Sequence, residues 1–212
     1  MIAILDYKAG NQTSVLRALR VLGIPAEITA DPHVLLNAEG VIFPGVGAAG
    51  QAMGRLCSTG MDKVLRSVTE RKIPLLGICL GCQILLERSE EDGDTPTLGL
   101  VRGVCRRFSP DWTDGGEPIR IPHMGWNTLS VRQNSELLEG VPPDPQVYFV
   151  HSYYPDLSPE LVIATCRYGK EFAAVYGRSG LWAVQFHPEK SGPAGLKILE
   201  NFHRYCRSVS HV

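Results

Sequence analysis

The sequence lacks the features of a membrane protein or a nucleic-acid-binding protein. No apolar run reaches the roughly 18 residues that a membrane span requires. Its 21 Lys and Arg residues nearly balance its 22 Asp and Glu residues, and both signs are mixed along the chain. We therefore expect no basic surface for nucleic acid or anionic lipid. Met1 leads directly into an apolar segment without the basic start of a signal peptide, so we expect a cytoplasmic protein.

The sequence also lacks the cysteine pattern of a disulfide scaffold or a zinc site. A zinc site needs about four ligands, and no second CxxC or HxxxH appears at a suitable spacing. We expect no metal and no organic cofactor. In a reducing compartment, six free thiols are expected. They belong to Cys57, Cys79, Cys82, Cys105, Cys166 and Cys206.

The pattern of apolar residues predicts one domain over residues 1–212, without repeats or a low-complexity linker. In the first half, strands alternate with helices. The predicted strands are 2–7, 26–29, 40–45 and 74–79, and the predicted helices are 12–22, a stretch ending near 70, and 82–89. This alternation predicts an α/β fold with a mostly parallel central sheet and helices on both faces.

The second half is richer in short strands, which we expect to add antiparallel strands to the sheet. These strands lie within "GLVRGVCRRF", "NTLSV", "VYFVHSYY", "LVIATCRYG", "FAAVYGR" and "LWAVQFH". The acidic, glycine-rich stretches 89–97 and 109–118 are predicted to be surface loops. A closing amphipathic helix is predicted over 193–206.

The segment "PLLGICLGC" (74–82) places a cysteine between two glycines at the end of an apolar strand. A sharp strand-to-helix turn requires such small residues, because side chains there would collide with neighbouring elements. The turn exposes the sulfur at a helix N-terminus, where unpaired N–H groups favour the thiolate. We therefore predict Cys79 as a nucleophile and Cys82 as an apolar neighbour. A thioredoxin-type CxxC couple is the competing interpretation, but it leaves the flanking glycines unexplained.

A base for this nucleophile is offered by "AVQFHPEKS" (183–191). His187 ends a predicted strand, and Glu189 follows two positions later, where an extended chain points to the same side. Cys79, His187 and Glu189 are thus predicted to form a triad. A histidine at a strand end is more often structural than catalytic, but of the six histidines only His187 has a carboxylate at orienting distance. His151 is the fallback base.

Acyl transfer also needs hydrogen-bond donors for the oxyanion. One predicted donor is the backbone N–H of Leu80, next to the nucleophile. The second is the N–H of Val46 in "FPGVGAAG" (43–50), where Gly45 and Gly47 allow the peptide to reorient. Taken alone, this segment is better interpreted as a plain strand-to-helix loop. Together with the Cys79 turn and the segment of His187 and Glu189, however, it is better interpreted as the source of an oxyanion donor.

Five segments together resemble a known family: "PGVGA", "GICLGCQ", "PHMGWN", "FVHSYY" and "QFHPEKS". In order and spacing they resemble class I (triad) glutamine amidotransferases, which have a flavodoxin-like α/β fold. More closely they are similar to the glutaminase subunits of imidazole glycerol phosphate synthase. The resemblance extends from "DYKAGNQTSV" to the last helix. Lys8 stands where the family usually has Gly, and Cys82 where Met is common.

The resemblance implies that Cys79 attacks the side-chain amide of glutamine and that His187 protonates the leaving nitrogen. It implies substrate contacts from the backbone near Gly47 and from Gln83, Ser152 and Tyr153. The ammonia would then pass through a shielded channel to a separate (β/α)₈-barrel cyclase subunit, in a heterodimer of histidine biosynthesis. The products there would be imidazole glycerol phosphate and an aminoimidazole carboxamide ribotide. A barrel requires about 200 or more further residues, so we expect the cyclase chemistry on another polypeptide.

Three residues are candidates for the partner interface: Trp126, Tyr148 and Lys190. Interfaces favour aromatic anchors, and Lys190 directly follows Glu189, although core packing explains the two aromatic residues equally well. Two other functions stay open. One is a paralogous glutaminase that feeds a sugar-modifying synthase, and the other is a non-enzymatic cysteine sensor on the same fold.

Overall fold

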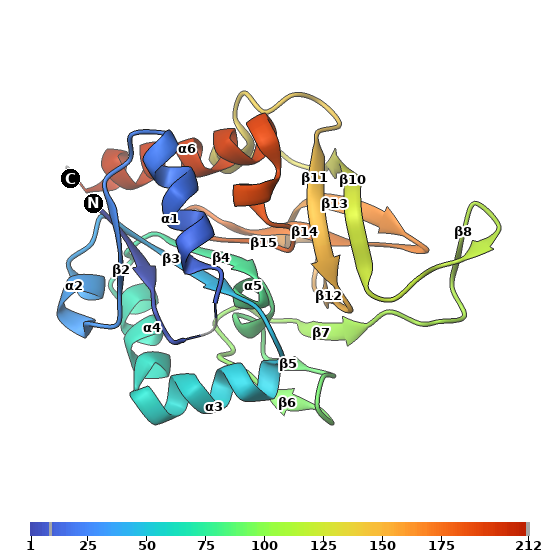
Figure 1. Cartoon of the computed structure of the whole chain (residues 1–212), viewed down its shortest axis with the longest axis horizontal. Helices are drawn as coiled ribbons and strands as arrows, with labels where there is room; N and C mark the ends of the chain where they lie inside the picture. Colours follow the sequence, from blue (N-terminus) through green and yellow to red (C-terminus); the bar gives the residue numbers. More distant parts are fainter. Residues whose placement is uncertain (9, 211–212) are drawn as a thin grey trace.

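A nine-stranded mixed sheet organises the chain (Figure 1). The computed structural model describes residues 1–8 and 10–210. Strands appear in the order β11-β10-β13-β14-β15-β4-β3-β1-β2. They are Ile2–Leu5 (β1), Ala26–Thr29 (β2), Gly40–Gly45 (β3), Leu75–Cys79 (β4), His123–Val131 (β10), Gln146–His151 (β11), Val162–Tyr168 (β13), Lys170–Arg178 (β14) and Leu181–Val184 (β15).

The sheet has a parallel half and an antiparallel half, which meet at β15. Strands β2, β1, β3, β4 and β15 pair in parallel, whereas β15, β14, β13, β10 and β11 pair antiparallel. Both the predicted parallel sheet and its antiparallel extension are therefore confirmed. Strand β15 lies between β14 and β4, so the last strand of the chain joins the two halves.

Helices cover both faces of the parallel half, as predicted. Gln12–Val21 (α1) and Gly192–Val209 (α6) lie on one face, and Ala49–Thr59 (α3) and Met61–Glu70 (α4) on the other (Figure 1). The alternation of strand side chains builds the two cores. Ile4 and Ile42 pack in the core beside α1 and α6, whereas Val41 and Phe43 pack in the core beside α3 and α4. A short helix, Pro32–Leu36 (α2), precedes β3.

The helix predicted at 82–89 is wrong in both bounds. Helix α5 spans Leu80–Ile84, and residues 88–89 form a strand, β5 (Arg88–Ser89). The backbone N–H groups of Leu98 and Leu100 donate to the carbonyls of Ile84 and Leu85. These bonds from a distant segment take the carbonyls that a longer helix would use, so the helix ends after one turn.

The segment predicted as one strand, "VYFVHSYY", is divided at Ser152. Its first part is β11 in the large sheet, and its second part is β12 (Tyr153–Asp156) in a four-stranded sheet. That sheet has the order β12-β7-β5-β6, with β7 at Val104–Arg107 and β6 at Thr95–Pro96. The predicted loop at 109–118 contains a small hairpin, β8 (Thr113–Asp114) and β9 (Glu117–Pro118). The change of sheet at Ser152 brings residues 151–153 beside the end of β4.

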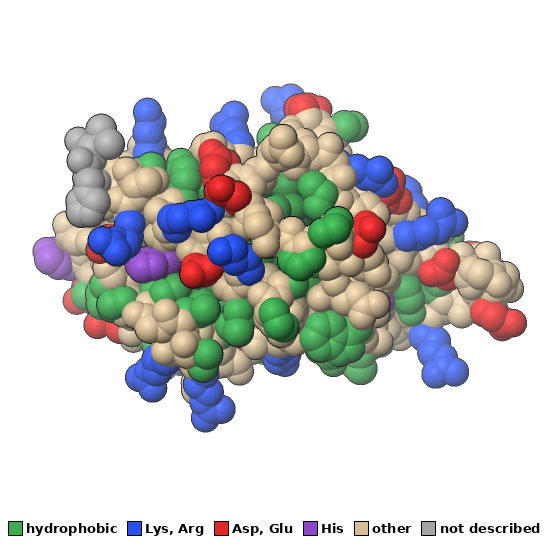
Figure 2. All heavy atoms as spheres, turned by 90° about the horizontal axis from the view of Figure 1, so that it is seen from above, with side chains coloured by type: hydrophobic (Ala, Val, Ile, Leu, Met, Phe, Trp, Pro, Cys, Tyr) green, Lys and Arg blue, Asp and Glu red, His purple; other side chains and the backbone are tan. Residues whose placement is uncertain are grey.

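The surface carries both signs of charge. On the face shown in Figure 2, Lys and Arg side chains are interspersed with Asp and Glu side chains. Across the described ranges, no helix has the length and apolar character needed to cross a bilayer.

The close packing of α5 on β3 generates a stability prediction. A Cβ atom at Gly81 would lie 1.8 Å from the carbonyl oxygen of Phe43, which is backbone and cannot move aside. We expect Gly81→Ala to lower the free energy of unfolding by at least about 2 kcal/mol, measured by urea denaturation. Gly54→Ala is the matched control, because it lies within α3 with no atom in contact range, and it should not destabilise. Equal stability of the two variants would contradict this account.

Candidate active site

Cys79 occupies a strained turn at the end of β4. Its backbone has φ 54° and ψ −111°, a conformation that L-residues rarely adopt. Gly77 and Gly81 permit the turn: a Cβ at Gly77 would lie 3.1 Å from the backbone of Cys82, and the space at Gly81 is smaller still. Cys79 is buried, with 6% of the residue exposed, at the start of α5. The spacing of the two glycines thus has the structural reason that the sequence predicts.

His187 and Glu189 lie together beyond the end of β15. The Nδ1–H of His187 donates to Oε1 of Glu189 over 2.8 Å, and both side chains are buried. The backbone N–H of His187 donates to the carbonyl of Tyr148, which ties it to β11. Among the described residues, Nε2 of His187 has no hydrogen-bond partner. Burial opposes protonation, but the neighbouring Cys79 and Glu189 outweigh it and raise the pKa of His187 to about 10.

Asn11 is a third member of this arrangement that the sequence analysis missed. Its Nδ2 donates to Oε1 of Glu189 over 2.9 Å. Asn11 precedes α1 in a left-handed conformation, φ 69°, yet its side chain makes no capping bond to that helix. An Asn at a helix start normally caps it. Here the side chain instead fixes a carboxylate 178 residues away in sequence.

A cavity of about 380 Å³ opens in front of the cysteine. It brings together most of the residues predicted for the nucleophile, the base, the oxyanion donors and the substrate. Its lining comprises Val46, Gly47, Cys79, Leu80, Gln83, Glu91, Pro122, Val150, His151, Ser152, Tyr153 and His187. Gly45 and Glu189 lie outside this lining, behind Val46 and His187 respectively.

The turn that carries Val46 has the expected freedom at only one of its two glycines. Gly47 has φ +100°, whereas Gly45 belongs to β3, where it pairs with Cys79. Gly45 is instead required by space, because a Cβ there would lie 2.2 Å from the Oη of Tyr7. Val46 itself is 41% exposed. Gly45, before Val46, is therefore held in β3, whereas Gly47, after it, has a conformation that favours glycine.

Glu91 is a further cavity residue that the sequence analysis missed. Its Oε2 accepts the backbone N–H of Ala49 at the start of α3, over 2.7 Å. Partial burial raises the pKa of Glu91. It lies in a stretch predicted as a solvated acidic loop, where nothing in the local pattern separates it from its acidic neighbours. Within the cavity lining as described, Glu91 is the sole carboxylate.

The fallback base, His151, lines the cavity but has both ring nitrogens engaged. Its Nδ1–H donates to the carbonyl of Tyr153 over 2.8 Å, and its Nε2 contacts Nδ1 of His123 at 3.0 Å. Because the carbonyl can only accept, Nε2 of His151 is the acceptor from His123. Nε2 of His123 in turn accepts from Nδ2 of Asn127 at 3.2 Å. Neither nitrogen of His151 is free to receive a proton from Cys79.

The three residues predicted for a partner interface form one surface cluster outside the cavity. The rings of Trp126 and Tyr148 are 6.1 Å apart, and Nζ of Lys190 lies 6.0 Å from the centre of the Tyr148 ring. Trp126 is 55% exposed, and Met124 on the same strand is 63% exposed. Core packing therefore does not explain Trp126.

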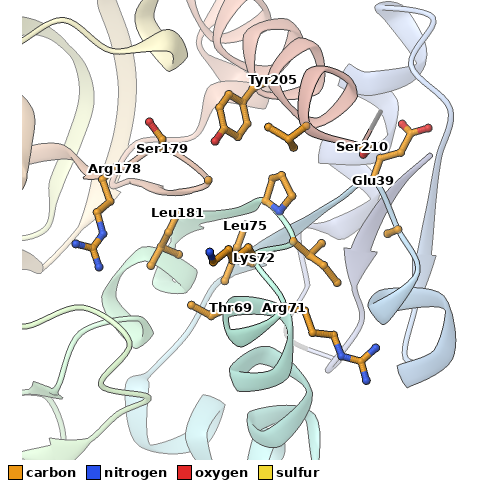
Figure 3. Close-up of a pocket in the computed structure, with 15 residues that line it drawn as sticks. Glu39, Thr69, Arg71, Lys72, Leu75, Arg178, Ser179, Leu181, Tyr205 and Ser210 are labelled. Atoms are coloured by element: carbon orange, nitrogen blue, oxygen red, sulfur yellow. The ribbon is translucent and has the colours of Figure 1, made fainter. Parts of the chain in front are cut away.

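A larger cavity, of about 730 Å³, lies at the opposite end of the parallel strands (Figure 3). Its wall includes Leu75 and Leu181, where β4 and β15 begin, together with Lys72 and Tyr205. None of the predicted site residues lines it. Ligands of parallel α/β sheets bind at the carboxyl ends of the strands, which is where the smaller cavity lies. Within residues 1–8 and 10–210, no group of three His, Cys, Asp or Glu side chains is placed to hold a metal.

The buried histidine pair predicts how stability depends on pH. Burial lowers the pKa of His123 to about 4 and that of His151 to about 3. As pH falls, both histidines are therefore protonated in the unfolded chain before they are protonated in the folded chain. The resulting stability is complete above about pH 6.5 and is lost as pH falls, by up to about 1.4 kcal/mol per pH unit for each histidine. His123→Gln should make this slope shallower in urea unfolding at several pH values. The exposed His33→Gln is the control, and an unchanged slope in His123→Gln would refute the assignment.

The comparisons with known proteins agree with this geometry. Residues 3–205 match the family described as Glutamine amidotransferase class-I. The chain is 64% identical over 211 residues to imidazole glycerol phosphate synthase subunit HisH of Nitratidesulfovibrio vulgaris strain DP4, covering 99% of each chain. It is 47% identical to the subunit of the same name from Streptococcus gordonii, covering 97% of this chain and 96% of the relative.

A solved structure has the same fold. It is the crystal structure of a glutamine amidotransferase, with a TM-score of 0.71 and 22% identity, over 100% of this chain and 99% of the other. The chain belongs to the class-I glutamine amidotransferase family and, within it, to the HisH subunits of imidazole glycerol phosphate synthase.

Proposed function

We propose that the chain hydrolyses the side-chain amide of glutamine, with Cys79 as nucleophile, His187 as proton carrier and Glu189 as the carboxylate that orients His187. The observation that carries this proposal is the shared cavity of Cys79 and His187, with Nε2 of His187 unpartnered among the described residues and Nδ1 bonded to Glu189. A base of this kind needs one nitrogen held and the other free. Cys79 and Glu189 outweigh burial and raise the pKa of His187, which favours its imidazolium form.

In the proposed reaction, the thiolate of Cys79 attacks the amide carbon and forms a C–S bond. The oxygen becomes an oxyanion, which the N–H groups of Leu80 and Val46 would stabilise. The imidazolium of His187 donates its Nε2 proton to the leaving nitrogen, and ammonia departs as the C–N bond breaks. Water then attacks the thioester carbon while Nε2 of His187 accepts one of its protons. The C–S bond breaks, glutamate departs, and the thiolate of Cys79 and the imidazolium of His187 are restored.

The cavity also suggests how glutamine is held. Glu91 offers a carboxylate for the substrate's α-ammonium group, and Gln83, Ser152 and Tyr153 offer polar groups around it. The backbone of Gly47 would contact the substrate beside the oxyanion donor. A volume of about 380 Å³ is large enough for a free amino acid.

We further propose that the ammonia passes to a (β/α)₈-barrel cyclase subunit in a heterodimer of histidine biosynthesis. The relatives' name supports this assembly, since it describes them as one subunit of imidazole glycerol phosphate synthase. It favours this function over a paralogous sugar-modifying synthase. The surface cluster of Trp126, Tyr148 and Lys190 is the proposed contact, because exposed aromatic residues are enriched at interfaces. The cytoplasm is the proposed location, where six free thiols remain reduced.

The triad is tested by glutamate release from glutamine, measured with the cyclase subunit bound. Cys79→Ala should abolish activity because the attacking atom is removed, and His187→Asn should be nearly as damaging. Glu189→Gln should cost less, because it orients the imidazole without transferring the proton itself. Cys57→Ala, at an exposed cysteine outside the cavity lining, is the control with unchanged activity. Glutamine turnover in Cys79→Ala would overturn the proposed function.

The interface is tested by titrating Lys190→Ala with the cyclase subunit. Loss of the ammonium group over Tyr148 should weaken complex formation or the coupling of the two activities, while the isolated chain keeps its thermal stability. Lys63→Ala, on the outer side of α4, is the matched control for loss of an exposed lysine. Unchanged affinity and coupling in separate alanine variants of Trp126, Tyr148 and Lys190 would remove the assignment.

A further inference from the structure

Gln185 is a fully buried polar residue that the triad does not include. It lies between the end of β15 and His187, and its backbone N–H donates to the carbonyl of Ala174 in β14. Its side chain reaches the nucleophile: Nε2 donates to Sγ of Cys79 over 3.9 Å. Its Oε1 accepts from Nε2 of Gln83 over 2.9 Å and from the thiol of Cys82 over 3.7 Å. One amide thus contacts both the attacking sulfur and a cavity residue.

The orientation of both amides follows from a single backbone carbonyl. The carbonyl of Tyr153 can only accept, so Gln83 must turn its nitrogen toward it, over 3.0 Å. The second hydrogen of that nitrogen points to Gln185, which must therefore present its oxygen. The nitrogen of Gln185 is then left facing Cys79. Exchanging oxygen and nitrogen in either amide would set two donors or two acceptors against each other.

We propose that Gln185 is a positioning residue for glutamine hydrolysis: its amide supplies an N–H to the sulfur of Cys79 and locks Gln83 with its oxygen toward the cavity. This inference rests on the proposed function. The N–H contact favours the charged thiolate over the neutral thiol. Both N–H bonds of Gln83 are occupied, so its Oε1 remains for the ligand. That oxygen accepts from an ammonium or carboxamide N–H and repels a carboxylate, which favours glutamine over its acid product.

The direct test is the pH dependence of Cys79 alkylation in Gln185→Met. Methionine keeps the length and volume of the side chain but has no N–H and no carbonyl. Iodoacetamide is the probe, in a Cys57→Ala background, with the peptide that contains Cys79 followed by mass spectrometry. The titratable groups around the sulfur are His187, Tyr7, Cys82 and Cys105 beside it, and Glu91, His151 and Tyr153 in the same cavity lining. All of them remain in the variant.

We expect the midpoint of alkylation to move up by about one pH unit in Gln185→Met, since a hydrogen bond to a charged group has been lost. With the cyclase subunit bound, kcat should fall about tenfold and KM for glutamine should rise, because Gln83 is no longer held. Gln83→Met should raise KM with a smaller shift of the midpoint. Gln146→Met, at an exposed glutamine on β11, is the control with neither change.

Gln185→Asn provides a second variant, because its amide is one methylene too short to reach both partners. It should shift the midpoint in the same direction. An unchanged midpoint in both variants, with only a lower thermal stability, would overturn the proposal and leave Gln185 a structural residue. Cys79→Ala distinguishes a failure of the proposed function from a failure of the role assigned to Gln185. If it abolishes turnover while the Gln185 variants keep the original midpoint, the proposed function stands and this inference alone fails.

Discussion

The architecture of the site depends on one backbone turn, at Cys79. A residue at φ 54° and ψ −111° costs of the order of 1–3 kcal/mol, so it persists only where its surroundings determine it. Those surroundings are β3 and β15, which flank β4 in parallel register, and α5, which packs directly on β3. Gly77 and Gly81 allow that contact, because their missing Cβ atoms would overlap backbone or the side chain of Leu85. Because β3 and β4 are buried along their whole length, the strain is maintained by packing within the core.

The remaining walls come from the antiparallel half of the sheet. His187 follows β15, and the division of a strand at Ser152 places His151, Ser152 and Tyr153 in the cavity lining. A chain of hydrogen bonds then leads inward, from Asn127 through His123 and His151 to the carbonyl of Tyr153. Gln83 donates to the same carbonyl. These hydrogen bonds connect β10, the strand that bears Trp126, to Gln83 and Tyr153 in the cavity lining. Each donor and acceptor in the series is fixed, and none of the groups is charged.

Much of this arrangement can be predicted from the sequence, for identifiable reasons. Two glycines around a cysteine at the end of an apolar strand have one ready explanation, and His187 and Glu189 are near enough in sequence to suggest a pair. The missed features depend on distant partners. Helix α5 ends early because Leu98 and Leu100 donate to its carbonyls. The roles of Asn11 and Gln185 come from bonds across 178 and 106 positions. Neither residue differs locally from an ordinary helix cap or a buried strand end.

The position of β15 has a consequence for synthesis of the chain. Strand β4 and its cysteine leave the ribosome about a hundred residues before Leu181, and β15 must later insert between β4 and β14. Until then the edge of β4 lacks its neighbour, and the thiol lacks both the imidazole and the buried amide beside it. A nascent chain in which β15 is not yet made therefore has a β4 edge without its partner strand, and its Cys79 lacks the contact from Gln185. The full set of contacts around Cys79 thus forms only after the segment that carries Gln185 and His187 has been synthesised and β15 has paired with β4.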